Sequence, residues 1–216
     1  MKNMHPHVSI VIPAYNSQSY IEACINSCIM QETEINYEVV VCDDASTDST
    51  NEILGFLYSD NKLIKIITNT LNVGVGFARN KAISMARGRY IFLLDSDDYI
   101  HPLTIQTLTV ALELRPDIDI VYSDYVYVDD NDQKSSRINA CEKPIACARL
   151  VRKSVFARHG LYESLRIGEE REFASRLNAN GINSLHLPLP LYRYRQHSMS
   201  LTSEYEQKRT YDKSHD

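Results

Sequence analysis

The sequence lacks a surplus of basic residues: 23 Lys and Arg stand against 28 Asp and Glu, a net charge of -5 over 216 residues. Proteins that bind nucleic acid use such a surplus to neutralise phosphates, so we expect no nucleic-acid partner. No apolar run approaches the roughly 20 residues that cross a bilayer. The first strand-like run breaks at Pro13 without a signal-peptide pattern. We therefore expect a cytoplasmic protein that at most rests on the inner face of the membrane.

Low-complexity segments and repeats of fixed period are also missing, which argues against a disordered chain or a solenoid. The five cysteines are odd in number and form no pair of pairs of the kind that binds zinc. We interpret them as reduced, buried thiols. Hydrophobic residues make up 44% of the chain, and its length suits one large domain.

The first half alternates between apolar runs rich in β-branched residues, typical of buried strands, and the three- and four-residue spacings of amphipathic helices. The expected strands are residues 8–12, 37–42, 63–67 and 90–94, and the expected helices lie within 17–30, 46–57 and 72–86. Ser46, Thr47 and Asp48 are of the residue types that cap helix N-termini, so we expect them to cap the second helix. This alternation predicts a mostly parallel sheet with helices on both faces.

The second half is less regular. We expect helices near 103–114, 153–159 and 169–178, one or two strands within 118–128, a polar loop over 129–144, and strands at 146–151 and 185–194. The predicted fold class is a single Rossmann-like three-layer α/β/α domain over residues 1–202, followed by a polar tail at 203–216.

Two expected strands end in acidic residues: Asp43 and Asp44 follow one, and the run from Asp95 to Asp98 follows another. Ligands of such sheets bind outside the carboxyl ends of the strands, so both clusters are predicted at the binding edge. Carboxylates are the ligands that Mg²⁺ and Mn²⁺ prefer, with phosphate and water completing the shell. The 95–98 cluster thus suits a metal that holds a nucleotide diphosphate.

Other nucleotide-binding proteins fit less well. A dinucleotide-binding dehydrogenase needs a glycine-rich turn after the first strand, and residues 13–16 contain no glycine. A nucleotidyltransferase would carry a glycine-rich, basic phosphate loop there, and this is missing too.

The chain contains five motifs whose sequences and order resemble those of family-2 inverting glycosyltransferases of the A-type nucleotide-sugar fold. The resemblance covers nearly the whole chain, from residue 8 to about 200. The motifs are VSIVIPAYN (8–16), VVVCDDASTDST (39–50), NVGVGFARNKAISMARGRYIFLLDSDD (72–98), RKSVFARHGLYES (152–164) and GEEREFASRL (168–177). The resemblance implies a nucleotide-binding half at about 1–98 and an acceptor half at about 99–202.

The resemblance also implies a sugar transfer from a nucleotide diphosphate, with UDP as the family's usual carrier, and a divalent metal, Mn²⁺ or Mg²⁺. Pro13, Tyr15 and Asp44 would form the nucleoside pocket, and Asp95 would face the ribose and sugar. Arg79 would order the donor site, with a surface ion pair as the competing interpretation. Asp97 would bind the metal.

Two further positions follow from the resemblance. His197 would approach the metal or diphosphate, and Arg193 and Arg195 are candidate contacts for diphosphate or acceptor. Family members usually carry Glu-Asp where this chain has Glu169 and Glu170, and the Asp takes the acceptor proton. Glu170 would be the base, with its carboxylate about one methylene further out, and catalysis is sensitive to displacements near 1 Å.

The acceptor expected from the family is a glycan or lipid-linked glycan of bacterial surface polysaccharide or glycoconjugate assembly. The sequence ends soon after residue 200, before the C-terminal helices of many members, so we expect a partner, peripheral membrane contact or an oligomer. A weakly active or inactive nucleotide-sugar-binding module is the alternative, because the substitution falls on the base itself.

Overall fold

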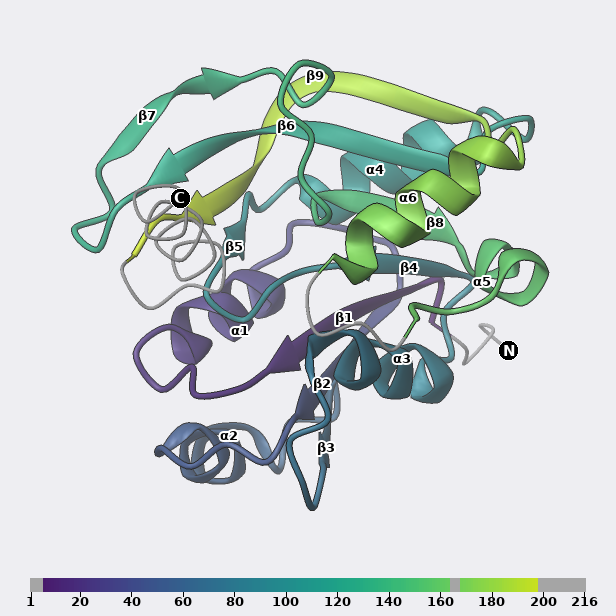
Figure 1. Cartoon of the computed structure of the whole chain (residues 1–216). Helices are drawn as coiled ribbons and strands as arrows, with labels where there is room; N and C mark the ends of the chain where they lie inside the picture. Colours follow the sequence, from purple (N-terminus) through teal and green to yellow (C-terminus); the bar gives the residue numbers. More distant parts are fainter. Residues whose placement is uncertain (1–5, 164–167, 198–216) are drawn as a thin grey trace, which may run out of the picture.

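A computed structural model describes residues 6–163 and 168–197 of the chain (Figure 1). The elements in chain order are β1 (Val8–Ala14), α1 (Ile21–Ile29), β2 (Tyr37–Asp43), α2 (Thr50–Tyr58), β3 (Ile64–Thr68), α3 (Val75–Met85), β4 (Tyr90–Leu93), β5 (Tyr99–Ile100), α4 (Thr104–Glu113), β6 (Ile120–Val128), β7 (Lys134–Ile138), β8 (Arg149–Arg152), α5 (Lys153–His159), α6 (Glu169–Ala179) and β9 (Ser184–Arg195). The predicted tail at 203–216 lies outside the described residues.

The strands form one mixed sheet in the order β3-β2-β1-β4-β8-β6-β9-β5, with β7 paired to the far part of β6. The pairs among β3, β2, β1 and β4 are parallel, as the βα alternation predicts. β8 is antiparallel to both β4 and β6, so β4 and β6 point the same way. The carboxyl ends of β1, β2, β4 and β6 therefore lie at one edge.

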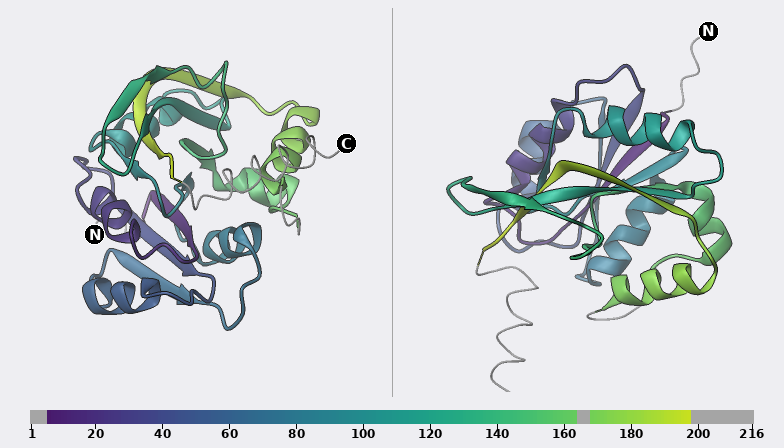
Figure 2. Two further views of the ribbon diagram at one scale, coloured as in Figure 1. Left: turned by 60° about the vertical axis from the view of Figure 1, so that its left-hand side comes forward. Right: turned by 90° about the horizontal axis from the view of Figure 1, so that it is seen from above.

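Helices cover both faces of this sheet: α1 and α4 lie on one face, and α3 and α6 on the other (Figure 2). The central strands β1, β2 and β4 are almost entirely buried because both of their faces carry helices. The three-layer α/β/α prediction is confirmed. No helix within the described ranges is long and apolar enough to span a membrane.

The predicted loop over 129–144 was wrong in its middle, where β7 pairs antiparallel with β6. Its residues are mostly exposed, so they carry no apolar alternation, and the strand exists through its main-chain pairing with β6. The run at 118–128, left as one strand or two, is the single strand β6. β5, with two residues, is too short to leave a sequence pattern.

The predicted helix caps were wrong for Ser46 and Thr47 but confirmed for Asp48, whose Oδ1 accepts from the Thr50 N–H at 3.0 Å where α2 begins. α2 begins at Thr50, after Ser49, and no side chain bonds to it from the cap position. Ser46 Oγ instead bonds to Asp43, and the main-chain N–H of Thr47 donates to Asn16 Oδ1 at 2.8 Å. The hydroxyl-rich segment therefore ties the loop after β2 to the loop after β1, which explains its composition.

Candidate active site

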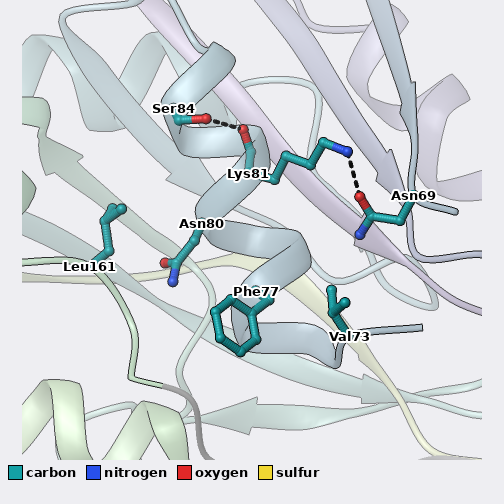
Figure 3. Close-up of a pocket in the computed structure, with 7 residues that line it drawn as sticks. All are labelled: Asn69, Val73, Phe77, Asn80, Lys81, Ser84 and Leu161. Carbon is teal, nitrogen blue, oxygen red and sulfur yellow. Dashed lines mark hydrogen bonds between the residues drawn. The ribbon is translucent and has the colours of Figure 1, made fainter. Parts of the chain in front are cut away.

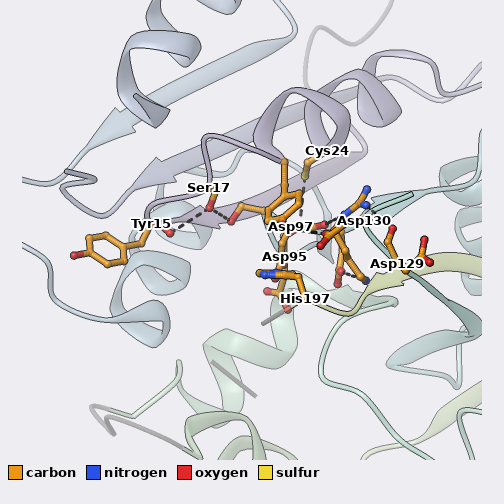
Figure 4. A network of polar contacts seen from close by, with 12 residues as sticks. Tyr15, Ser17, Cys24, Asp95, Asp97, Asp129, Asp130 and His197 are labelled. Carbon is orange, nitrogen blue, oxygen red and sulfur yellow. Dashed lines mark hydrogen bonds and ion pairs between the residues drawn. The ribbon is translucent and has the colours of Figure 1, made fainter. Parts of the chain in front are cut away.

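The acidic turn after β4 points its carboxylates in different directions. The N–H of Asp98 donates to the carbonyl of Asp95 at 3.1 Å, which closes the turn. The Asp95 and Asp97 side chains are about 30% exposed, whereas Asp98 is buried. Figure 4 shows Asp95 and Asp97 close together beside His197, with Tyr15 pointing away from them. Asp95 and Asp97 are thus the members of the turn that can meet a ligand.

Asp98 holds the turn in place. Its carboxylate accepts from the Tyr192 hydroxyl at 2.6 Å and from the Arg195 N–H at 2.7 Å, both on β9. Burial raises the pKa of Asp98 well above its usual range, and the neighbouring charges of Asp97 and Asp95 add to the rise. Tyr192, which the sequence analysis missed as a site residue, also accepts from the Asp95 N–H at 3.3 Å.

The structure brings together the two expected metal ligands. His197 Nε2 lies 3.0 Å from Asp97 Oδ2, and the imidazole rests against the Tyr20 ring with centroids 4.5 Å apart. Among the described residues no set of three or more His, Cys, Asp or Glu side chains could enclose a metal ion. A pair of ligands nevertheless suits Mg²⁺ or Mn²⁺, which keep waters and take substrate phosphates in the remaining positions.

Arg195 has other partners than the diphosphate or acceptor that the sequence suggested. Its buried guanidinium donates to the carbonyls of Asp97 and Asp129, at 3.1 and 3.0 Å, and pairs with Asp132 at 3.2 Å. Arg193 donates to the carbonyl of Pro190. Arg195 therefore fastens the acidic turn to the loop between β6 and β7.

Asp44 is buried, and its carboxylate is bound by the loop before α3. It accepts from Asn69 Nδ2 at 2.7 Å, from the Val73 N–H at 3.1 Å and from the Gly74 N–H at 2.8 Å. In the structure Asp44 thus fixes residues 69–74, and its contact with a nucleobase stays a prediction. Pro13 is buried at the end of β1, and Tyr15 beyond it is 45% exposed.

Beside α3 lies a pocket of about 390 Å³ (Figure 3). Its lining is Asn69, Val73, Phe77, Asn80, Lys81, Ser84 and Leu161. It contains none of the predicted site residues, although Asn69 and Val73 are the residues that Asp44 holds. The pocket therefore borders the predicted nucleoside side without belonging to the acidic cluster.

Arg79 on α3 links the acidic turn to the start of α6. The guanidinium lies 2.9 Å from Asp95, 3.1 Å from Glu170 and 3.7 Å from Glu169, and it stacks over the Tyr162 ring at 5.0 Å. The side chain is 2% exposed, so the surface-ion-pair interpretation is wrong. Burial lowers the pKa of Arg79, but the carboxylates of Asp95 and Glu170 outweigh this effect and raise the pKa well above its usual range.

Glu170 carries a carboxyl group with a raised pKa. Burial raises the pKa of Glu170 to about 6, the Arg79 guanidinium opposes the rise, and the carboxylates of Asp95 and Glu169 add to it. Its side chain is 36% exposed, against 6% for Glu169, which packs against Gly76 of α3. A carboxylate with a pKa near 6 is mostly ionised at pH 7 and still accepts a proton readily.

The start of α6 depends on Gly168. This residue has a φ of +94°, in the left-handed region that glycine adopts without the steric cost of a Cβ. The next two residues enter the helix and face α3. The local sequence GEE thus places Glu170 beside Arg79, although the sequence alone does not show which of the two glutamates stays accessible.

The structure and the site define a glycosyltransferase A-type fold with carboxylates at its ligand edge. Solved structures of Staphylococcus aureus TarS have this fold. The complex titled with UDP-GlcNAc superposes with a TM-score of 0.76 at 24% identity, covering 91% of this chain and 60% of that one. The family model described as "Glycosyl transferase family 2" matches residues 9–174, and the chain belongs to this family.

Curated relatives match different shares of the chain. A hyaluronan synthase of Pasteurella multocida is 44% identical over 104 residues, which cover 48% of this chain and 10% of that protein. Glycosyltransferase GlyG of Streptococcus pneumoniae is 34% identical over 126 residues, covering 58% of this chain and 41% of GlyG. Putative glycosyltransferase EpsH of Bacillus subtilis is 27% identical, covering 94% of this chain and 64% of EpsH. The chain spans less than two thirds of each relative.

Proposed function

We propose that this chain transfers a sugar from a UDP-sugar to a hydroxyl of a glycan acceptor, with inversion at the anomeric carbon, in bacterial surface polysaccharide assembly. The observation that carries the proposal is the Asp95–Arg79–Glu170 arrangement, in which one buried guanidinium contacts both carboxylates. Membership of the family supports the reaction type, and the TarS complex titled with UDP-GlcNAc supports the donor class.

The reaction we propose is a single displacement. Glu170 takes the proton from the attacking hydroxyl as the new glycosidic bond forms, and the bond from the sugar to the diphosphate breaks. Attack from the side opposite the leaving diphosphate inverts the configuration. Arg79 keeps Glu170 and Asp95 at fixed positions, so the base and the donor sugar are held in one geometry.

Asp97 and His197 are the residues that would hold Mn²⁺ or Mg²⁺. Such a metal, when bound, neutralises charge on the leaving diphosphate. The acidic turn keeps Asp97 accessible because Asp98 and Arg195 fasten it to β9 from behind.

The proposal is tested by incubating the chain with UDP-glucose, UDP-N-acetylglucosamine and UDP-glucuronic acid in the presence of Mn²⁺ and measuring UDP release. We expect release from one donor in preference to the others and, when a glycoside acceptor is added, a glycoside product whose anomeric proton coupling shows inverted configuration. Binding of a UDP-sugar, seen as a raised melting temperature, without any release would favour the non-catalytic binding module.

A further inference from the structure

A second group of polar side chains, outside the residues considered so far, lies where β6 pairs with β9. Tyr122 on β6 stands opposite His186 on β9, and their rings stack with centroids 5.2 Å apart at 27°. Asp124 is two residues beyond Tyr122 on the same strand, and successive even positions share a face. We call Tyr122, Asp124 and His186 the β6–β9 cluster.

Asp124 fixes the orientation of His186. Its side chain is fully buried, and Oδ1 lies 2.6 Å from His186 Nε2 and accepts from the Ala140 N–H at 2.9 Å. The other oxygen lies 3.3 Å from Arg137 Nε. A buried carboxylate in contact with one imidazole nitrogen keeps the proton on that nitrogen, so we assign the proton to Nε2. Nδ1 of His186 is then the hydrogen-bond acceptor.

The His186 ring can be reached from outside. Its side chain is 21% exposed, whereas a histidine that served only to fill the core would be buried with its partner. Tyr122 beside it is partly exposed, and its hydroxyl lies 3.3 Å from Cys141 Sγ. Burial raises the pKa of Tyr122 to about 12, and the contact with Cys141 adds to the rise, so the hydroxyl keeps its proton near pH 7.

The β6–β9 cluster lies on the same face of the sheet as Asp95 and is level with the end of β4. Leu93 of β4, Arg149 of β8 and Tyr122 of β6 stand in one row across the three strands. Tyr90, on the opposite face of β4, contacts Glu113 of α4. The row therefore faces away from α4, toward the layer of α3 and α6.

Cys147, two residues before Arg149 of β8, lies next to the acidic turn. The pairing continues past Tyr122, because the Ser123 N–H donates to the Ala148 carbonyl at 3.1 Å. Burial raises the pKa of the Cys147 thiol, and the neighbouring Asp95 carboxylate adds to the rise, so those two side chains are adjacent. In the strand order β4-β8-β6-β9, Asp124 lies two strands from β4 and His186 lies three, a span of about 10–15 Å at the usual strand spacing.

We propose that His186 binds the acceptor glycan, with Nδ1 accepting a hydrogen bond from a sugar hydroxyl, and that Asp124 is the positioning residue that fixes its tautomer. This assignment rests on the proposed function. The donor sugar would lie at Asp95, and the span of about 10–15 Å to the cluster leaves room for the acceptor sugar between Asp95 and His186. The face that holds the donor thus also orders the acceptor, through β6 and β9.

The test uses the p-nitrophenyl β-glycosides of glucose, galactose, N-acetylglucosamine and glucuronic acid as acceptors, with the same UDP-sugar donors. UDP release without acceptor reports the donor side, and glycoside elongation reports the acceptor side. We expect His186→Ala to raise the acceptor KM about tenfold, the scale of one lost hydrogen bond, and to leave donor hydrolysis unchanged. His159→Gln, on α5, is the matched control and should behave as wild type.

Asp124→Asn separates positioning from support of the fold. The asparagine oxygen can still accept from the Ala140 N–H and still faces His186 Nε2, whereas its NH₂ group replaces the oxygen beside Arg137. The substitution therefore removes the negative charge that holds the imidazole proton on Nε2. We expect the acceptor KM to rise as in His186→Ala, with kcat and donor hydrolysis kept. A lower melting temperature with an unchanged KM would show that Asp124 only supports the fold and would overturn its positioning role.

The outcomes for the two proposals differ. If wild type releases no UDP from any donor, the proposed function fails, and the acceptor site fails with it. If wild type releases UDP but neither elongates nor binds any of the glycosides, the acceptor site alone fails. If wild type elongates a glycoside and His186→Ala has the same KM, the role of His186 is wrong while the transferase stands.

Discussion

Replacing Arg79 with methionine should move the pH dependence of transfer, because Arg79 is the group that opposes the raised pKa of Glu170. The guanidinium lies 3.1 Å from Glu170, and an opposite charge at that range lowers a carboxyl pKa by about 1–3 units. Without it the pKa should rise from about 6 to roughly 7–9. The base must be ionised to take a proton, so the acid limb of the profile should move to higher pH.

The size of the effect follows from the ionised fraction. At pH 7 a carboxyl with a pKa of about 6 is roughly 90% ionised, and at a pKa of about 8 it is roughly 10% ionised. The assay is UDP release, with kcat/KM measured from pH 5 to 9. The readout is the pH of the acid limb. The maximal kcat/KM is not used, because it also falls when Asp95 loses its ion pair with Arg79.

Arg79→Lys is the matched control, since it keeps a positive charge at the site and should leave the acid limb near pH 6. Removing one partner from a buried charge network costs about 3–5 kcal/mol, so both variants need a melting curve before assay. An Arg79→Met enzyme that folds, turns over and keeps the wild-type acid limb would refute the proposed coupling between Arg79 and Glu170.

Two other variants probe the nucleoside and metal sides. Asp44→Ala should lower the melting temperature, and the free energy of unfolding by about 2–4 kcal/mol, because three donors of the 69–74 loop lose a buried acceptor. Asp60→Ala, in the exposed turn after α2, is the control. Equal melting temperatures for the two variants would contradict the structural role of Asp44. Mn²⁺ should raise the affinity for UDP measured by calorimetry, and Asp97→Ala should abolish this gain. Asp130→Ala is the control and should keep the gain. A Mn²⁺-dependent gain in Asp97→Ala would show that Asp97 is not a metal ligand.

The sequence predicts the first half of the fold well because each element there carries its own pattern. β1, β2 and β4 are buried on both faces, so they appear as uninterrupted apolar runs. β7 could not be predicted, since its side chains are exposed and its stability comes from pairing with β6. Local sequence contains no record of such long-range pairing.

The candidate site could be predicted as a list of residues but not as a network. The acids after β2 and β4 stand out in the sequence, yet Asp44 and Asp98 bind their own chain while Asp95 and Asp97 remain accessible. That division depends on Tyr192, Arg195 and the 69–74 loop, which are distant in sequence. Asp124 and His186 are 62 residues apart and meet only through the β6–β9 pairing.

The central claim is that Glu170 takes the proton from the acceptor hydroxyl, and one comparison tests it most directly. Glu170→Gln keeps the size of the side chain and cannot act as a base, and Glu172→Gln, two residues along the same helix, is the control. We expect Glu170→Gln to lose at least about a hundredfold in the rate of sugar transfer, within the range for general bases, and to bind UDP as wild type does. Transfer by Glu170→Gln at the rate of Glu172→Gln would contradict the account.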